Sequence, residues 1–268
     1  MNTDLPMNEL DQTIAAMVRS RAAFPDFLRA IVKGDLCFLR NYHVGVEDEP
    51  LVIKKGEIFP LALLEDADGK FTPLFTSEAR AEEGMRAGNV PMLTYLPGTL
   101  PAKQLLGMLG VTSFGAIINK GCVTGEIAIR AELIRDLASG KVLKPTENDP
   151  IPNITGTMKA LDPADYPTEL VQNAFDFMRR HKNFRAAWIW LLDAAGRTGY
   201  TTGVVMDPPD AVLFHDFNLA LHAGLSRDYG SHIVVLDKKR TAEFEQVLKL
   251  SSPFYTAPDY LSPPGTKV

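Results

Sequence analysis

Proline is concentrated in one stretch of this 268-residue chain, and that stretch divides the sequence into two blocks. Five prolines fall within the 27 residues 141–167. Proline has no backbone N–H and restricts the residue before it, so such a stretch cannot form a central strand of a sheet. We therefore predict a Pro-rich linker at 146–167, which joins a domain at 21–145 to a second domain at 168–250.

Both ends of the chain lie outside these two predicted domains. Apolar residues recur at helical spacing within residues 1–20, which predicts an N-terminal helix. Residues 251–268 contain four prolines and three aromatic residues. We expect this Pro/aromatic tail either to be disordered or to dock on the protein through its rings.

Short turns join strand-like and helix-like runs in both blocks. In the first block, an acidic Gly-containing turn separates the β-compatible runs 59–64 and 71–76, which predicts a hairpin. Ser77 then stands where the N-cap of a helix is expected. In the second block, 184–194 and 200–206 predict another hairpin. The expected fold class is α+β with two domains, each a mainly antiparallel or mixed sheet flanked by helices.

Charge and hydropathy argue against two classes of partner. The chain has 28 Lys and Arg against 33 Asp and Glu, a net charge of −5, whereas nucleic-acid binders need a concentrated positive surface. The longest apolar run, 186–192, has seven residues, far short of the ~20 that span a bilayer. The N-terminus has no basic region followed by an apolar core, which a secretory signal requires. We therefore expect no nucleic acid, no membrane association and a cytoplasmic location.

The residues that usually carry catalysis or bind metals show no recognisable arrangement. The sequence has no Walker A loop, no GxGxxG and no GxSxG motif. Cys37 and Cys122 are too few for a disulfide framework or a four-thiolate zinc site, so we expect reduced core residues. His215 and His222 are seven residues apart, whereas metal-binding pairs on a helix prefer three or four. We predict no catalytic residue, no metal and no cofactor, and hence a protein that is not an enzyme.

Three short segments resemble the SseB family, the bacterial "enhanced serine sensitivity" proteins. Residues 59–77 are similar to the family's signature hairpin, in which an acidic Gly turn leads into Pro-x-Phe-Thr-Ser. Residues 117–121, Ile-Ile-Asn-Lys-Gly, resemble the following strand, which usually ends Asn-Pro-Gly, so Lys120 departs from the pattern. Residues 161–188 look like the entry to the family's C-terminal domain. The resemblance covers most of residues 21–250 and implies one N-terminal-like and one C-terminal-like SseB domain.

The resemblance implies a cytoplasmic protein that has no established enzymatic activity and is linked to serine tolerance. A non-enzymatic interaction or regulatory protein with an unidentified protein partner is our first hypothesis, and homo-oligomerisation stays open. The binding surface of such a protein is predicted at Phe75, Thr76, Ser77, Asn119 and Trp188. The alternative is a small-molecule, amino-acid-related binding protein or cryptic enzyme, with His215, Asp216 and Asn119 lining a pocket.

Overall fold

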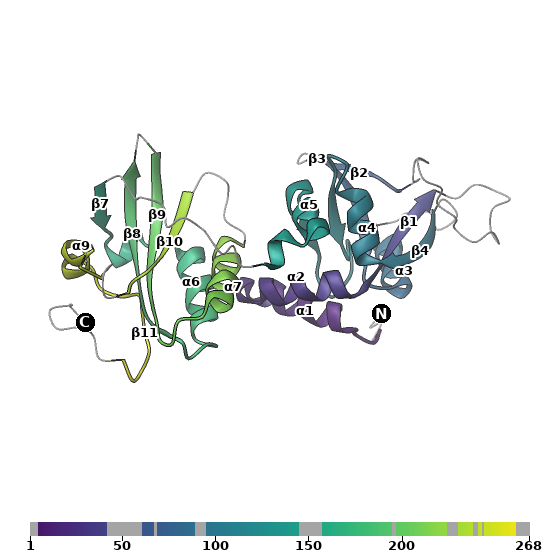
Figure 1. Ribbon diagram of the computed structural model, residues 1–268. Helices are drawn as coiled ribbons and strands as arrows, with labels where there is room; N and C mark the ends of the chain where they lie inside the picture. The colour runs from purple at the N-terminus through teal and green to yellow at the C-terminus, as the bar shows by residue number, and fades with distance from the viewer. Residues whose placement is uncertain are drawn as a thin grey trace. The chain divides into compact units, whose positions relative to one another are not determined.

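The protein consists of two compact units, each with its own sheet (Figure 1). Unit 1 comprises Met1–Arg19 and Asp26–Lys144, and unit 2 comprises Ser20–Pro25 and Pro145–Val268. The α+β fold with two sheets is therefore confirmed. The residues that this computed structural model describes are 5–41, 61–66, 69–88, 95–144, 157–194, 197–223, 230–237, 241–242 and 244–260.

Unit 1 contains a six-stranded mixed sheet in the order β4-β1-β3-β5-β6, with β2 paired to β3. Strand β5 runs parallel to β3, whereas the other pairs are antiparallel. The strands are β1 (Asp35–Asn41), β2 (Leu64–Asp66), β3 (Gly69–Phe75), β4 (Tyr95–Pro101), β5 (Gly115–Ile118) and β6 (Ile127–Ile129). The helices are α1 (Glu9–Arg19), α2 (Phe24–Lys33), α3 (Glu78–Ala87), α4 (Ala102–Leu109), α5 (Ala131–Ser139) and the 3-10 turn η2 (Lys141–Leu143).

The predicted hairpin of unit 1 is present as β2 and β3, which pair antiparallel. Its first strand begins later than the predicted run 59–64, of which residues 59 and 60 lie outside the described residues. Leu61 does not pair with β3 and forms an isolated bridge with Arg40 of β1. The predicted helix cap is confirmed, because the Ser77 hydroxyl accepts a hydrogen bond from the backbone N–H of Arg80 at 3.2 Å. Local turn and capping chemistry thus determines how the chain passes from β3 into α3.

Helix α3 covers one face of the unit 1 sheet. Side chains of a strand alternate between the two faces, so Cys37 and Leu39 of β1 point to the same face. These two residues form one buried cluster with Phe75 of β3 and Met85 of α3. The end of β3 and the last turns of α3 therefore pack against each other.

Unit 2 contains a five-stranded mixed sheet in the order β10-β9-β8-β11, with β7 paired to β8. Strand β10 runs parallel to β9, and β8 is antiparallel to β7, β9 and β11. The strands are β7 (Thr157–Ala160), β8 (Phe184–Ala194), β9 (Arg197–Met206), β10 (Gly230–Val235) and β11 (Tyr255–Thr256). The helices are η1 (Arg21–Ala23), η3 (Pro163–Asp165), α6 (Thr168–Met178), α7 (Ala211–His222) and α9 (Glu245–Leu250).

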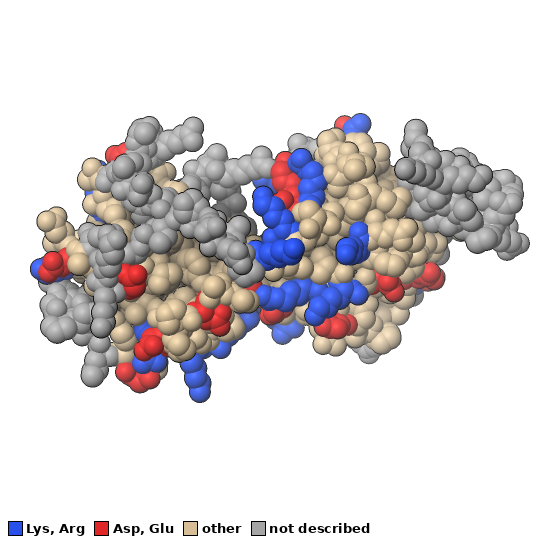
Figure 2. Space-filling view, viewed as in Figure 1, with Lys and Arg blue, Asp and Glu red and all other residues tan. Residues whose placement is uncertain are grey.

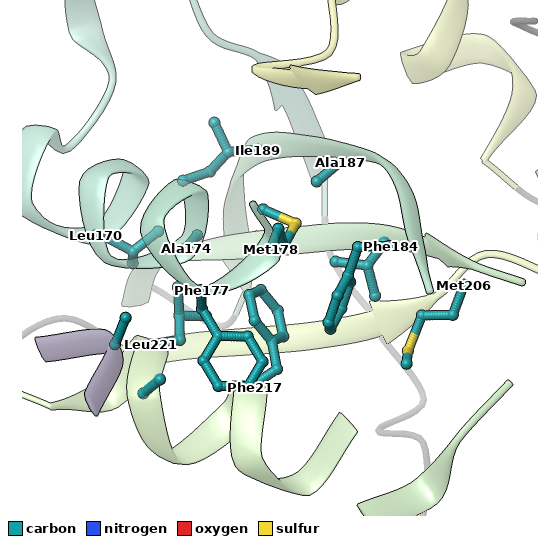
Figure 3. Close-up of a cluster of buried hydrophobic side chains, with 13 residues drawn as sticks. Leu170, Ala174, Phe177, Met178, Phe184, Ala187, Ile189, Met206, Phe217 and Leu221 are labelled. Carbon is teal, nitrogen blue, oxygen red and sulfur yellow. The ribbon is translucent and has the colours of Figure 1, made fainter. Parts of the chain in front are cut away.

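Apolar side chains cover the unit 2 sheet on both faces. On one face, Phe184 packs with Phe177 of α6 and Phe217 of α7, and Figure 3 shows these rings close together. On the other face, Trp188 and Trp190 of β8 belong to a second buried cluster with residues of α9. Helices thus lie on both sides of the sheet in unit 2, as the run of apolar residues in β8 requires.

Part of the predicted linker is a strand in the structure. Thr157–Ala160 form β7, which pairs with Trp190–Asp193 of β8. The expectation of a linker throughout 146–167 fails here because the prolines are unevenly spaced, and no proline falls between Pro152 and Pro163. These four residues keep all their backbone donors and pair at the edge of the sheet, the position where a neighbouring proline is tolerated.

The described part of the tail docks on unit 2. Tyr255–Thr256 form β11 beside Ala186 and Ala187 of β8. Tyr260 packs against the cluster that contains Trp188. Of the two expectations for the tail, docking through aromatic rings therefore holds for residues up to Tyr260. Residues 261–268 lie outside the described residues.

Gly203 of β9 lies beneath the Trp190 indole. A Cβ atom at Gly203 would lie 2.4 Å from Cη2 of Trp190, which is too close for any real contact. Trp190 is also held by stacking on Phe244, with ring centroids 5.6 Å apart, and by donating from Nε1 to the Ser251 hydroxyl at 2.9 Å. The indole therefore has little freedom to move aside.

We predict that Gly203→Ala lowers the free energy of unfolding of unit 2 by about 1–3 kcal/mol, the usual cost of overpacking. Both tryptophans of the chain lie in unit 2, so their fluorescence during urea unfolding measures this change. In a Trp190→Phe background the same substitution should cost less, because the indole that it meets is absent. Equal costs in the two backgrounds would contradict the proposed contact.

Candidate functional site

Unit 1 buries a carboxylate and a guanidinium together with two neutral polar side chains. Asp11 is 1% exposed, Arg80 2% and Asn119 0%, and Thr76 is also buried. They come from α1, from α3, and from the ends of β5 and β3, which are parallel neighbours and therefore end at the same edge of the sheet. Charged side chains are almost never fully buried unless they are paired, so this group needs a complete set of partners.

The Asp11 carboxylate accepts hydrogen bonds on both oxygens. Its Oδ1 accepts from the Thr76 hydroxyl at 2.5 Å and from Nδ2 of Asn119 at 3.0 Å. Its Oδ2 accepts from Nε of Arg80 at 3.3 Å. The backbone N–H of Thr76 donates to Oδ1 of Asn119 at 3.0 Å, which joins the ends of β3 and β5. We call these four residues the Asp11 network.

Arg80 has a second carboxylate partner in Glu83, one helical turn further along α3. Nη1 of Arg80 donates to Oε2 of Glu83 at 2.6 Å, and Oε1 of Glu83 accepts from the backbone N–H of Val123 at 2.9 Å. Burial by itself lowers the pKa of Arg80, but the hydrogen bond with Glu83 and the charge of Asp11 outweigh burial and raise that pKa above its ordinary value. The guanidinium therefore stays charged and holds α1 to α3, while Glu83 holds the turn after β5 to the same helix.

The turn that follows β5 begins in an uncommon backbone conformation at Asn119. Its φ of 55° lies in the left-handed region, which Asn adopts more readily than most residues. The backbone N–H of Cys122 donates to the Asn119 carbonyl at 3.0 Å, and its Sγ lies 3.3 Å from the Arg80 carbonyl. The Asp11 network thus fixes where this turn lies against α3.

Gly84 allows the turn and helix α3 to approach each other closely. A Cβ atom at Gly84 would lie 2.5 Å from the carbonyl oxygen of Lys120 and 2.5 Å from the ring of Phe75. Any larger residue there would push the turn away from the helix. Lys120 and Phe75 are the neighbours in sequence of Asn119 and Thr76, so the network and this contact act on the same segments.

A pocket of about 290 Å³ lies at this contact. Its lining is mainly apolar and comes from β1, β3, α3 and the turn after β5. The lining residues are Leu39, Ala62, Leu64, Pro73, Phe75, Gly84, Met85, Ala87, Gly88, Tyr95, Lys120, Gly121 and Glu126. An apolar cavity of ~150 Å³ accommodates benzene, and most ligand pockets have ~300–1,000 Å³, so this one suits a small aromatic ligand.

Four of the five residues that the sequence predicts as a binding surface come together near this pocket. Phe75 is 2% exposed and lines the pocket, Thr76 and Asn119 are buried in the Asp11 network, and Ser77 is half-buried as the cap of α3. Their polar atoms bond within the protein, so they form an interior wall in the structure and not an exposed surface. Thr76, Ser77 and Asn119 do not line the pocket themselves, but Phe75 and Lys120, which are their neighbours in sequence, do.

The remaining predicted residues lie elsewhere. Trp188 belongs to unit 2 and is buried in the cluster against α9. His215 and Asp216 lie on α7 of unit 2, whereas Asn119 belongs to unit 1. None of these residues lines the unit 1 pocket, so the pocket expected from His215, Asp216 and Asn119 is not the one found here.

Sequence reasoning missed Asp11, although the sequence holds a signal for it. The buried stripe of α1 contains Leu10, Ile14 and Met17, and Asp11 lies one helical turn before Ile14 on the same side. A carboxylate within an apolar stripe must find a partner when the stripe is buried. Arg80 and Lys120 have no comparable local signal, because their roles depend on contacts between distant segments.

Charged side chains are mixed on the face drawn in Figure 2, where Lys and Arg gather over α2, α4 and α5 of unit 1. Arg29 of α2 pairs with Asp26 at 3.6 Å and Arg135 of α5 with Glu132 at 3.7 Å, each within its own helix. Within the described residues, no three His, Cys, Asp or Glu side chains are grouped to hold a metal ion. No helix in that same part of the chain is long and apolar enough to cross a membrane.

Comparison with family models, with curated proteins and with solved structures finds no match to this chain. The SseB resemblance therefore depends on the short motifs alone, and the pocket and the Asp11 network are the observations from which a function can be argued.

Both cysteines are free and buried, as the sequence predicts. Burial, with smaller contributions from Glu78 near Cys37 and Glu83 near Cys122, raises the pKa of each thiol to about 12. The pKa of each thiol is higher in the folded than in the unfolded protein. The thiols therefore contribute fully to the free energy of unfolding below pH ~9, and this contribution is lost as the pH rises from ~9 to ~12.

We predict that the native protein at pH 8 reacts slowly with Ellman's reagent, because the thiolate is the reactive form and is scarce. In urea both thiols should react at once. The measurement is the rate of thionitrobenzoate release before and after unfolding. Rapid labelling of the native chain would show that a thiol is accessible or ionised.

Replacing Asp11 should destabilise unit 1 strongly. We predict that Asp11→Asn lowers the free energy of unfolding by about 3 kcal/mol, because Arg80 then lacks one of its buried counter-charges. The control is Glu9→Gln, which replaces an exposed acid in the same helix and should change the free energy of unfolding by less than ~0.5 kcal/mol. Far-ultraviolet circular dichroism during urea unfolding measures both variants. Equal effects would contradict a specific role for Asp11.

Proposed function

We propose that this protein binds a small, mainly apolar molecule in the unit 1 pocket. The observation that supports this most is the pocket itself, with about 290 Å³ of space and apolar side chains from Leu39, Phe75 and Met85. Apolar clefts with a few polar groups at defined positions are the usual form of ligand sites. Of the two functions that the sequence leaves open, this is the small-molecule binding protein.

Rigid walls support the proposal. Phe75 is followed in the chain by Thr76, and Lys120 is preceded by Asn119, and both Thr76 and Asn119 bond to the buried Asp11 carboxylate. Moving either wall would break a hydrogen bond to the buried Asp11 carboxylate, which is costly. A pocket that is held in shape before binding loses less entropy when a ligand enters, and so binds it more tightly.

The hypothesis of a non-enzymatic interaction protein has less support than small-molecule binding. It placed the contact surface at side chains of which Phe75, Thr76, Asn119 and Trp188 are buried. Its remaining basis is the SseB resemblance, on which a cytoplasmic location and a link to serine tolerance also depend as proposals. Binding alone requires no reaction at the site, and the absence of enzymatic activity stays a prediction.

Filling the pocket should weaken binding. N-phenyl-1-naphthylamine is a neutral dye whose fluorescence rises in apolar surroundings, and we predict that the full-length protein binds it. Ala87→Phe places a ring in the pocket and should weaken dye binding at least about 10-fold, a loss of ~1.4 kcal/mol. Fluorescence titration measures the dissociation constant.

The matched control is Ala79→Phe, the same substitution at an exposed position of α3 outside the pocket. It should leave dye binding unchanged. Equal loss in both variants, or no dye binding by the wild-type chain, would contradict a ligand site here. Thermal unfolding of the two variants shows that each is folded.

A further inference from the structure

Two oppositely charged residues line a pocket that is otherwise almost entirely apolar. Lys120 lies in the turn after β5, and Glu126 lies just before β6. Apart from the Tyr95 hydroxyl, the other lining side chains carry no polar group. A positive and a negative group at an apolar site are the kind of polar features that select and orient a ligand.

These two charges do not neutralise each other in the structure. No ion pair joins Lys120 to a carboxylate among the described residues. The backbone N–H of Gly121 donates to Oε2 of Glu126 at 3.1 Å, which holds this carboxylate beside the turn. The charge of Lys120 is therefore available to an anionic group, and Oε1 of Glu126 to a cationic group.

The end of helix α3 adds to the negative side of the pocket. Ala87 and Gly88, the last residue and the C-cap of this ten-residue helix, both line it. A helix C-terminus carries partial negative charge from its unpaired carbonyl groups, which favours a nearby cation. Glu126 and the α3 terminus thus favour a positive group on the ligand, and Lys120 favours a negative one.

We infer that the pocket takes a zwitterion with an apolar body, that is, an amino-acid-like molecule with a large apolar side chain. Its cationic group lies toward Glu126 and the end of α3, its anionic group toward Lys120, and its body against Phe75 and Met85. A ligand with only an anionic group would be repelled by the Glu126 carboxylate, and a ligand with only a cationic group would be repelled by the Lys120 ammonium. This inference rests on the proposed function, because it specifies the ligand of the same pocket.

Three small molecules with the same indole ring separate the charge requirement from the apolar one. Tryptophan is a zwitterion, tryptamine a cation and indole-3-propionate an anion. In competition with N-phenyl-1-naphthylamine on the full-length protein, tryptophan should displace the dye at about a threefold lower concentration than either of the others, as expected for a partly exposed ion pair. Serine, a zwitterion without an apolar body, should not displace the dye.

Two variants assign the charges to residues. Lys120→Met should raise the concentrations of tryptophan and indole-3-propionate needed for displacement by about threefold, and should not raise the concentration of tryptamine. Glu126→Gln can still accept the hydrogen bond from Gly121. It should raise the concentrations of tryptophan and tryptamine needed for displacement by about threefold. The matched control is Lys103→Met, which replaces an exposed lysine of α4 outside the pocket. It should leave the concentrations of all three indoles needed for displacement unchanged.

The outcomes distinguish this inference from the proposed function. If the dye binds and the three indoles displace it equally, or if serine displaces it as well as tryptophan does, the zwitterion inference is overturned and the binding site remains. If tryptophan is preferred but neither Lys120→Met nor Glu126→Gln alters that preference, the assignment to these residues is overturned. If the dye does not bind, the proposed function fails, and this inference fails with it.

Discussion

The burial of the Asp11 carboxylate is the constraint on which the arrangement of unit 1 depends. A charge in the interior must keep its partners, and those of Asp11 are Arg80, Thr76 and Asn119 on three further elements. Such a network adds little net stability compared with an apolar core, because desolvation offsets its attraction. We interpret its role as specificity, because other arrangements of α1, α3 and the strand ends would leave the charge unpaired.

The same constraint links the fold of unit 1 to its pocket, whereas unit 2 is held together differently. In unit 1 the pocket walls are sequence neighbours of the network residues, so the polar interior and the apolar site have one common geometry. In unit 2 the alternation of β8 sends Trp188 and Ile189 to apolar clusters on opposite faces. We therefore expect ligand binding to depend on unit 1, and unit 2 to rely on close packing.

Local patterns in the sequence were enough to predict the hairpin of β2 and β3, the Ser77 cap and strand β8, because each depends on neighbouring residues. The high proline density of 141–167 conceals strand β7, which falls in the proline-free interval between Pro152 and Pro163. The pocket could not be predicted, because Phe75, Met85 and Lys120 meet only when β3 and β5 pair in parallel across the intervening helices. No rule of spacing along the chain encodes such a contact.

A titration of the isotope-labelled, full-length protein with N-phenyl-1-naphthylamine, followed by amide chemical shifts, tests most directly that the ligand site lies in unit 1. The account predicts that the largest changes occur at Phe75, Met85 and Gly121, while amides of the unit 2 core such as Val204 and Phe217 keep their positions. Changes that are largest in unit 2, or that are spread evenly over both units, would contradict it.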